Sequence, residues 1–320
     1  MNRTSDWRPD ILGGAFEMKH ISMPDDYSGA VQCTVVRLQA ASTKWAAVYV
    51  HGFSDYYFQK ELAEAFVAHN ISFYAVDLRK YGRSLTAGQP MFQVRDIREY
   101  FPDIRASIDT AVSDGASEII LIGHSTGGLS TSLYMEEEPH PAVRALILNS
   151  PFLAWNLPAW MRKAVVPVVS AIGKYIPRLP VKSGGTIDYG RSLARHLGGE
   201  WTYDTTFKPD IMPDVDAGWI RAIDTAQKAL KKGQINVPVL LMHSARSAYP
   251  GDGPEKFSDA DGVLNVDSIA DAGRLLGKDV TEVSFDGGLH DLVLSRPSVR
   301  KQVYDTIFAW LSRVLATAQK

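Results

Sequence analysis

The stretch "LIGHSTGG" (121–128) joins a strand-like apolar run to a serine that stands between glycines. Its centre, "GHSTG" (123–127), fits the pattern Gly-x-Ser-x-Gly. The preceding run "SEIILIGHS" is typical of a buried strand, and the following "GLSTSLYMEEE" is typical of a helix. A strand, a sharp turn and a helix in this order are the arrangement of a nucleophile elbow.

The small residues of this turn have a physical reason. A sharp strand-to-helix turn leaves no room for side chains at Gly123 and Gly127, and it lifts the Ser125 hydroxyl out of the sheet. The hydroxyl then lies at the positive end of the next helix. The same geometry directs the N–H of Thr126 toward a developing oxyanion. The pattern therefore predicts Ser125 as a nucleophile.

A second turn, in "YVHGFSDYYF" (49–58), follows another apolar run. In hydrolases that use such an elbow, a His-Gly turn after an earlier strand supplies the second oxyanion donor. We expect this donor to be the N–H of Phe53. His51 is interpreted as a hydrogen-bonding residue that braces the turn, not as a base.

A serine hydroxyl needs a base, and the base needs an orienting acid. Of the eight histidines, His290 in "FDGGLHDLVLS" fits best, because it follows the last expected strand. His243 ends the apolar run "VPVLLMHS" and is better explained as a core histidine. With the chain order serine, acid, histidine, the acid is expected after the strand that ends near Ser244 and before the helix "VDSIADAGRLLG".

Four aspartates compete for the acid position. Turn chemistry accounts for Asp252 in "PGDG", and Asp267 fits the first turn of a helix. Asp261 precedes "GVLNV", whose apolar residues could anchor the loop beside His290. We favour Asp261, with Asp259 as the alternative.

Short apolar runs alternate with helical patterns along most of the chain. The runs at 45–52, 71–78, 117–125, 143–150, 237–244 and 280–287 are expected to be buried strands. Near-continuous apolar strands joined by helices indicate an α/β fold, a mostly parallel sheet covered on both faces. Two alternating runs before residue 40 could form a hairpin at its edge.

The alternation of strand and helix patterns stops after Ser150, where four tryptophans and seven prolines accompany no clear strand. We expect residues 151–235 to form a helical cap, or lid, and residues 1–150 and 236–320 to form the core. The alternative is a long irregular connection, which is uncommon in compact domains.

The amino-acid composition limits the classes of partner and the cellular location that we expect for this protein. The net charge of -2, from 34 basic and 36 acidic residues, does not favour nucleic acid. The single cysteine, Cys33, excludes an intrachain disulfide and is expected in the core. The most apolar stretch, "AVVPVVSAIG" (164–173), is too short to span a membrane, and "MNRTSDWRPD" lacks a secretory signal. We therefore expect a cytoplasmic protein whose oligomeric state is open.

No metal-ligand spacing, phosphate-binding loop or dinucleotide motif stands out, so no cofactor and no metal are expected. The charged turn "DLRKYGRS" (77–84) is interpreted as ion pairs that brace a loop.

Taken together, the chain resembles the α/β-hydrolase superfamily, most of all the serine aminopeptidase S33-type or monoacylglycerol lipase-like hydrolases. The matching pieces are "VYVHGFSDY", "YAVDLRKYGRS", "LIGHSTGG", "LILNSP", "PVLLMHS" and "GGLHDLVLS", in family order. The resemblance implies Ser125 as nucleophile, His290 as base, Phe53 and Thr126 as oxyanion donors, and a cap after Ser150. The loop after Ser244 is longer than in many relatives, and Asp261 matches the acid best because Val263 and Leu264 follow it.

The expected activity is hydrolysis of a small carboxylic ester, of the monoacylglycerol or medium-chain type, through an acyl-enzyme. Apolar cap residues suggest an acyl pocket and a transient contact of the cap with a lipid surface. The alternatives are an aminopeptidase, in which Asp210, Asp214 and Asp216 would bind the substrate amine, and a non-catalytic ligand-binding protein.

Overall fold

The computed structural model describes residues 6–42, 44–230 and 235–317. The first five residues, for which the sequence analysis expects no secretory signal, and residues 231–234 of the expected cap lie outside this description. No helix in the described ranges is both long enough and apolar enough to cross a bilayer.

A nine-stranded sheet forms the centre of the molecule, in the order β1-β2-β3-β5-β4-β6-β7-β10-β11. The six strands from β5 to β11 in this order run parallel to one another, whereas the pairs β1–β2, β2–β3 and β3–β5 are antiparallel. This confirms the mostly parallel sheet and the edge hairpin. The strands are β1 (Arg8–Pro9), β2 (Glu17–Asp26), β3 (Gly29–Leu38), β4 (Trp45–Val50), β5 (Ser72–Asp77), β6 (Glu118–His124), β7 (Val143–Asn149), β10 (Val239–Ser244) and β11 (Val280–Phe285).

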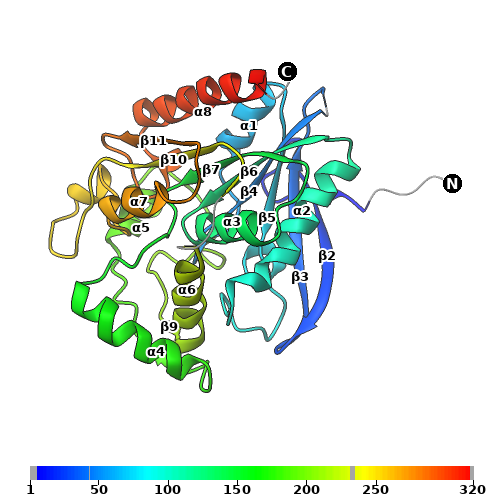
Figure 1. Ribbon diagram of the computed structural model, residues 1–320. Coiled ribbons are helices and arrows are strands. Elements are labelled where there is room, and N and C mark those ends of the chain that lie inside the picture. Colours follow the sequence, from blue (N-terminus) through cyan, green and yellow to red (C-terminus); the bar gives the residue numbers. More distant parts are fainter. Residues whose placement is uncertain (1–5, 43, 231–234, 318–320) are drawn as a thin grey trace.

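Helices cover both faces of this sheet (Figure 1). One core cluster joins alternate strand residues to α1 (Lys60–Ala68) and α8 (Pro297–Thr317). The other joins the remaining strand residues to α2 (Phe101–Ser113), α3 (Thr126–Glu137), α6 (Ala217–Leu230) and α7 (Val266–Gly273). Strands buried on both faces explain the near-continuous apolar runs of the sequence.

The chain leaves the sheet between β7 and β10, and we call this segment the β7–β10 connection. It contains a π-helical turn (Met161–Val165), α4 (Val166–Gly173), α5 (Asp188–Leu193), α6, and the two-residue strands β8 (Pro180–Val181) and β9 (Val215–Asp216). The small β8–β9 pair is absent from the sequence prediction. Two residues per strand are too few for a recognisable alternating pattern.

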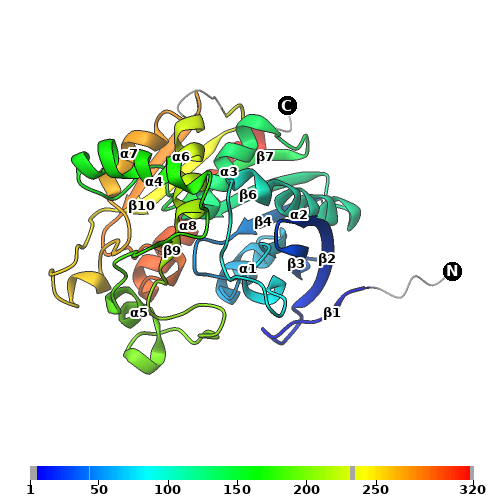
Figure 2. The ribbon, with the colours of Figure 1, turned by 90° about the horizontal axis from the view of Figure 1, so that it is seen from below.

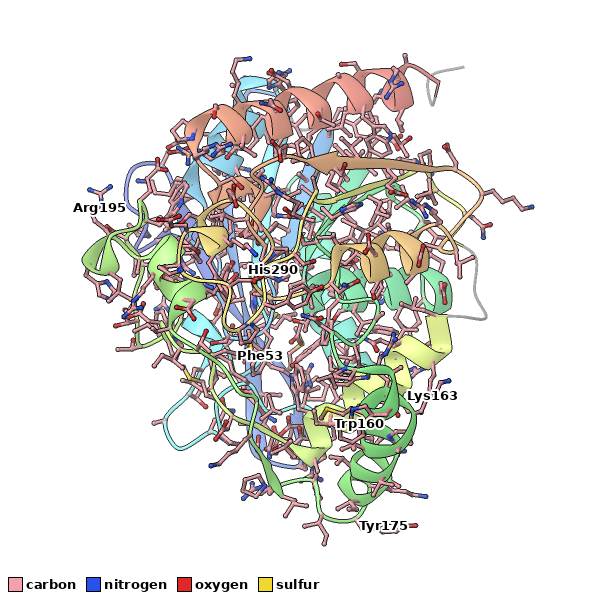
Figure 3. The ribbon with its side chains drawn as sticks, turned by 90° about the vertical axis from the view of Figure 1, so that its left-hand side faces the viewer. Phe53, Trp160, Lys163, Tyr175, Arg195 and His290 are labelled. Atoms are coloured by element: carbon pink, nitrogen blue, oxygen red, sulfur yellow. The ribbon has the colours of Figure 1, made fainter. Side chains whose placement is uncertain are left out.

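Most of the β7–β10 connection lies at one end of the sheet, while α6 packs against α3 (Figures 1 and 2). Ala222, Ile223 and Leu230 of α6 belong to the core. Figure 3 views this end and shows Phe53 and His290 centrally, with Trp160, Lys163 and Tyr175 on the outer part of the connection. The carboxyl ends of parallel strands are where α/β sheets place their ligand sites.

Candidate active site

The turn between β6 and α3 holds Ser125 in an unusual backbone conformation, with φ 53° and ψ -119°. A positive φ costs a residue other than glycine on the order of 1–3 kcal/mol, so the surroundings must impose it. Asn149 of β7 accepts a hydrogen bond from the Ser125 N–H, and the Ser125 carbonyl accepts one from Phe152. These bonds clamp the serine between the sheet and the start of the β7–β10 connection.

Glycine is required around this turn because neighbouring backbone lies too close for a side chain. A Cβ at Gly127 would overlap the carbonyl oxygens of Val50 and His51. A Cβ at Gly52 would lie 2.8 Å from the Cβ of Ser125. The turn after β4 therefore approaches the serine closely, as the sequence predicts for an oxyanion donor.

The structure brings Ser125, His290 and Asp261 together, although they come from three separate loops. The Ser125 Oγ lies 3.0 Å from Nε2 of His290, and Nδ1 of His290 lies 2.9 Å from Oδ2 of Asp261. Because Asp261 accepts at Nδ1, the proton of the neutral ring is on Nδ1 and Nε2 is free to accept from the serine. All three side chains are buried.

Two backbone N–H groups hold the other oxygen of Asp261. Val263 and Leu264 each donate to Oδ1 at 2.8 Å. The sequence analysis noted Val263 and Leu264 for their apolar side chains, but it is their backbone N–H groups that orient the Asp261 carboxylate. Asp259, the alternative acid, lies at the surface and pairs with Arg246 at 3.1 Å.

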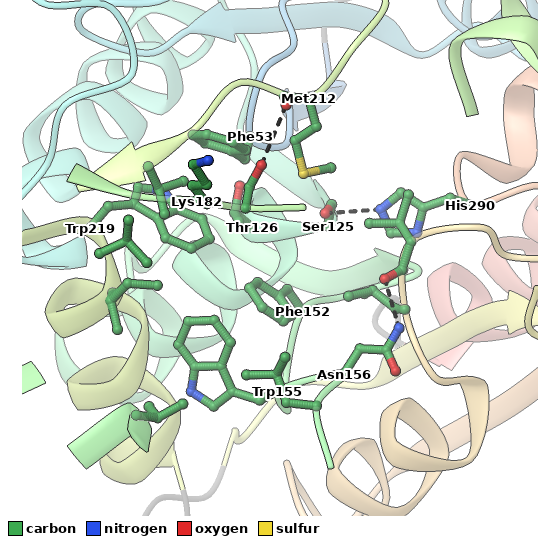
Figure 4. Close-up of a pocket in the computed structure, with 18 of the residues that line it drawn as sticks. Phe53, Ser125, Thr126, Phe152, Trp155, Asn156, Lys182, Met212, Trp219 and His290 are labelled. Carbon is green, nitrogen blue, oxygen red and sulfur yellow. Dashed lines mark hydrogen bonds between the residues drawn. The ribbon is translucent and has the colours of Figure 1, made fainter. Parts of the chain in front are cut away.

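Phe53 and Thr126, the expected oxyanion donors, line the same cavity as Ser125 and His290 (Figure 4). Thr126 is the first residue of α3, so its N–H has no acceptor within the helix. His51 braces the adjacent turn as expected: its Nδ1 donates to the Gly52 carbonyl and its Nε2 accepts from the N–H of Leu78. Burial lowers the pKa of His51, which suits this neutral structural role.

The cavity above Ser125 has a volume of about 260 Å³ and mostly apolar walls. Phe152, Trp155 and Trp219 form one side of it, and Met161, Val165 and Val169 of the β7–β10 connection form another. A second cavity of about 660 Å³ adjoins it and shares Phe53, Tyr189 and Lys208. Its remaining lining is more polar and includes Asp210, Ser54 and Tyr203.

A buried charged cluster that the sequence did not reveal lies beside the catalytic candidates. Asp55 contacts the Lys208 ammonium at 3.2 Å and Nδ1 of His124 at 3.7 Å. The ring of His124 lies 5.0 Å from that of His290. Asp291, whose charge also acts on His124, accepts a hydrogen bond from Asn149 at 2.7 Å. The residues of this cluster come from distant parts of the chain, so no local sequence pattern could have predicted the cluster.

The protonation of this cluster follows from its charges. Burial alone would raise the pKa of Asp55, but Lys208 and His124 outweigh it and lower the pKa to about 2. Burial favours the neutral ring of His124, but Asp291 and Asp55 raise its pKa. Asp55, His124 and Asp291 offer ligand atoms within 4.8 Å of one another, as a metal ion needs. The Lys208 charge already neutralises Asp55 and opposes a second cation there.

Other residues noted in the sequence have structural roles. In "DLRKYGRS", Arg83 pairs with Asp10 at 2.6 Å and with Asp77 at 2.8 Å, which confirms ion pairs that brace a loop. His243 is buried and donates from Nδ1 to the Ser244 carbonyl. Cys33 is fully buried, and burial raises the pKa of its thiol.

The sheet order, the elbow after β6 and the helices on both faces define an α/β-hydrolase fold. Within this fold class, the chain belongs to the family described as serine aminopeptidase, S33, whose model matches residues 41–254.

Solved structures of the same fold include two monoacylglycerol lipases. The enzyme of Paleococcus ferrophilus superposes with a TM-score of 0.65 at 19% identity, over 88% of this chain and 98% of that chain. A soluble variant of monoglyceride lipase from Saccharomyces cerevisiae gives a TM-score of 0.65 at 16% identity, over 92% and 95%.

Among curated proteins, Phospholipase YtpA of Bacillus subtilis (strain 168) is 29% identical over 142 residues. The match covers 44% of this chain and 52% of that relative, so this chain spans about half of the relative's length.

Proposed function

We propose that this protein is a serine hydrolase that cleaves carboxylic esters with an apolar acyl chain, of the monoacylglycerol or medium-chain type. The observation that carries the proposal is the 3.0 Å contact between Ser125 Oγ and His290 Nε2 at the floor of an apolar cavity. The two monoacylglycerol lipase structures that share the fold, and the phospholipase relative, support the same chemical class.

In the proposed reaction, His290 takes the hydroxyl proton while Ser125 Oγ bonds to the ester carbonyl carbon. The oxyanion accepts hydrogen bonds from the N–H groups of Phe53 and Thr126. The carbon–oxygen bond to the alcohol then breaks, and His290 protonates the departing alcohol. Water cleaves the acyl-enzyme by the same steps, and Asp261 keeps the imidazole oriented throughout.

In this proposal, the two adjoining cavities bind different parts of the substrate. The acyl chain occupies the apolar cavity, and the alcohol part faces the more polar one. Residues 151–235 then act as a cap over the serine, anchored in the core by α6.

An aminopeptidase requires a free carboxylate for the substrate amine. Asp55 is the one carboxylate that lines the Ser125 cavity within the described ranges, and Lys208 neutralises it. The three candidate aspartates are engaged elsewhere: Asp210 with His196, Asp214 with Ser183 and Asp216 with Trp219. These contacts favour an uncharged apolar ester.

The test is a panel of p-nitrophenyl acetate, butyrate, octanoate and palmitate, with 1-monoacylglycerols and aminoacyl-arylamides alongside. We expect kcat/KM to rise from acetate to octanoate, and amides to be turned over poorly. Ser125→Ala should lower kcat by on the order of 10⁴-fold or more. Preferred turnover of the arylamides, or a Ser125→Ala loss below tenfold, would reject the proposal. Binding of an ester by the unaltered protein without any turnover would instead indicate a non-catalytic binding protein.

A further inference from the structure

The outer side of the helix that covers the Ser125 cavity is apolar, although it faces water. Trp160 is 65% exposed, Val168 is 59% exposed and Tyr175 is 78% exposed. With the exposed residues Ala164 and Ala171 they follow a spacing of 4, 4, 3 and 4 residues along the chain. Val168 and Ala171 lie in α4, Ala164 lies in the π-helical turn before it, and Trp160 and Tyr175 flank these two elements.

The inner side of α4 and of the π-helical turn before it packs against the protein. Val166, Ser170 and Gly173 are buried, and Met161, Val165 and Val169 line the cavity. The apolar residues of the inner side are therefore already covered by the protein or by the cavity. The outer apolar side has no such partner within the described part of the chain.

Charge sets this segment apart from the rest of the molecule. Residues 160–182 contain five cationic residues and no acidic residue, whereas the whole chain carries a net charge of -2. The five are exposed: Arg162, Lys163, Lys174, Arg178 and Lys182. The same 23 positions hold five of the eleven exposed large hydrophobic residues of the described structure, among them Ile176 and Leu179.

We propose that this surface, the cationic apolar face formed by exposed residues between Trp160 and Lys182, binds a lipid bilayer that carries anionic headgroups. Its apolar side chains would enter the headgroup region while its cations approach lipid phosphates. Figure 3 shows Trp160, Lys163 and Tyr175 projecting from this part of the connection.

A lipid surface fits better than a protein partner for a compositional reason. Protein interfaces are depleted in lysine, and three of the five cations here are lysines. An anionic bilayer, by contrast, attracts every Lys or Arg that comes within a Debye length, about 8 Å at physiological salt. No acidic residue between positions 160 and 182 opposes that attraction.

The face is also continuous with the cavity. Lys182 belongs to both, and α4 contributes Val168 to the face and its neighbour Val169 to the cavity. An apolar substrate that leaves the bilayer would therefore meet the cavity without crossing the aqueous surface of the core. This last step rests on the proposed function, whereas bilayer binding does not.

The binding test uses the whole chain with vesicles of phosphatidylcholine alone and of phosphatidylcholine mixed equally with phosphatidylglycerol. We expect co-sedimentation with the anionic vesicles, weakened by high salt. The triple variant Lys163→Glu, Lys174→Glu, Arg178→Glu should lower the vesicle affinity by on the order of a hundredfold or more. None of these cations forms an ion pair in the described structure.

A matched control reverses three exposed lysines elsewhere, Lys256→Glu, Lys278→Glu and Lys301→Glu, so that both variants carry the same net charge. It should bind like the unaltered protein. For the apolar part, Trp160→Ala with Tyr175→Ala should weaken binding, while Leu275→Ala, at a residue 69% exposed in the turn after α7, should not. Circular dichroism and turnover of soluble p-nitrophenyl butyrate show whether each variant is folded.

Equal binding to both kinds of vesicle, or equal losses in the two charge-reversal variants, would overturn the proposal. So would a dimer in size-exclusion chromatography that Trp160→Ala with Tyr175→Ala dissociates, because the face would then be a protein interface. If anionic vesicles are bound but no ester is cleaved, the proposed function fails and the bilayer proposal stands.

Discussion

The position of Asp261 depends on peptide groups as well as on its own residue type. Its Oδ1 is fixed by the N–H groups of Val263 and Leu264, which leaves Oδ2 for His290. An amide in place of the carboxylate can donate to Nδ1, and it then favours the wrong tautomer of the imidazole.

We predict that Asp261→Asn lowers kcat for p-nitrophenyl butyrate by about 10⁴-fold, with little change in KM. Asp259→Asn is the matched control and should retain full activity, since Asp259 is exposed and contacts Arg246. If the Asp259 variant lost activity and the Asp261 variant did not, the acid would be misassigned.

Residue patterns singled out Ser125 and His290 because each follows an expected strand, whereas Asp261 was favoured for the apolar residues that follow it. Asp55, His124 and Lys208 could not be found in this way. They lie at positions 55, 124 and 208, and the fold alone brings them together. The cations of residues 160–182, in contrast, are readable from the sequence, but their exposure is not.

At the scale of elements, the Asp55–Lys208 pair joins the turn after β4 to the β7–β10 connection. Both side chains are buried. Removal of one partner leaves an uncompensated buried charge, which costs about 3–5 kcal/mol.

Lys208→Met should therefore lower the free energy of unfolding at neutral pH by about 3–5 kcal/mol, measured by urea denaturation. The double variant Asp55→Asn with Lys208→Met should recover part of the loss, because no buried charge remains. Equal stability of the single variant and the unaltered protein would show that the pair contributes nothing.

The lowered pKa of Asp55 also gives stability a pH dependence of known sign. A folded pKa of about 2 against an ordinary value of 3.8 means that protons bind the unfolded state more readily. The stabilisation is complete above pH 3.8 and is lost as the pH falls toward 2, by about 2 kcal/mol. In Asp55→Asn, the unfolding free energy should fall less over this window.

The two sides of α4 allow a matched test of the acyl cavity. Val169 lines the cavity, whereas its neighbour Val168 faces outward. We predict that Val169→Trp lowers kcat/KM for the octanoate ester by on the order of tenfold or more relative to the acetate ester. Val168→Trp should leave this ratio unchanged. Equal effects of the two substitutions would place the acyl chain elsewhere.

At the scale of the whole molecule, the sequence predicted the sheet and the helices on its faces because strands buried on both sides have continuous apolar runs. The order of the strands was not predicted, since periodicity does not specify which strands pair. The role of α6 was not foreseen: Ala222 and Ile223 belong to the core, although they lie within the segment expected to form the cap. An amphipathic pattern shows that a helix buries one side, not what that side is buried against.

The central claim is that one serine, activated by a distant histidine, carries the chemistry. Its most direct test is reaction with a fluorophosphonate, followed by peptide mass mapping. We predict one phosphonyl group per chain, on the peptide that contains Ser125, and strongly reduced labelling of Ser125→Ala and His290→Ala. Equal labelling of the Ser125→Ala protein, or a label mapped to another serine, would contradict the account.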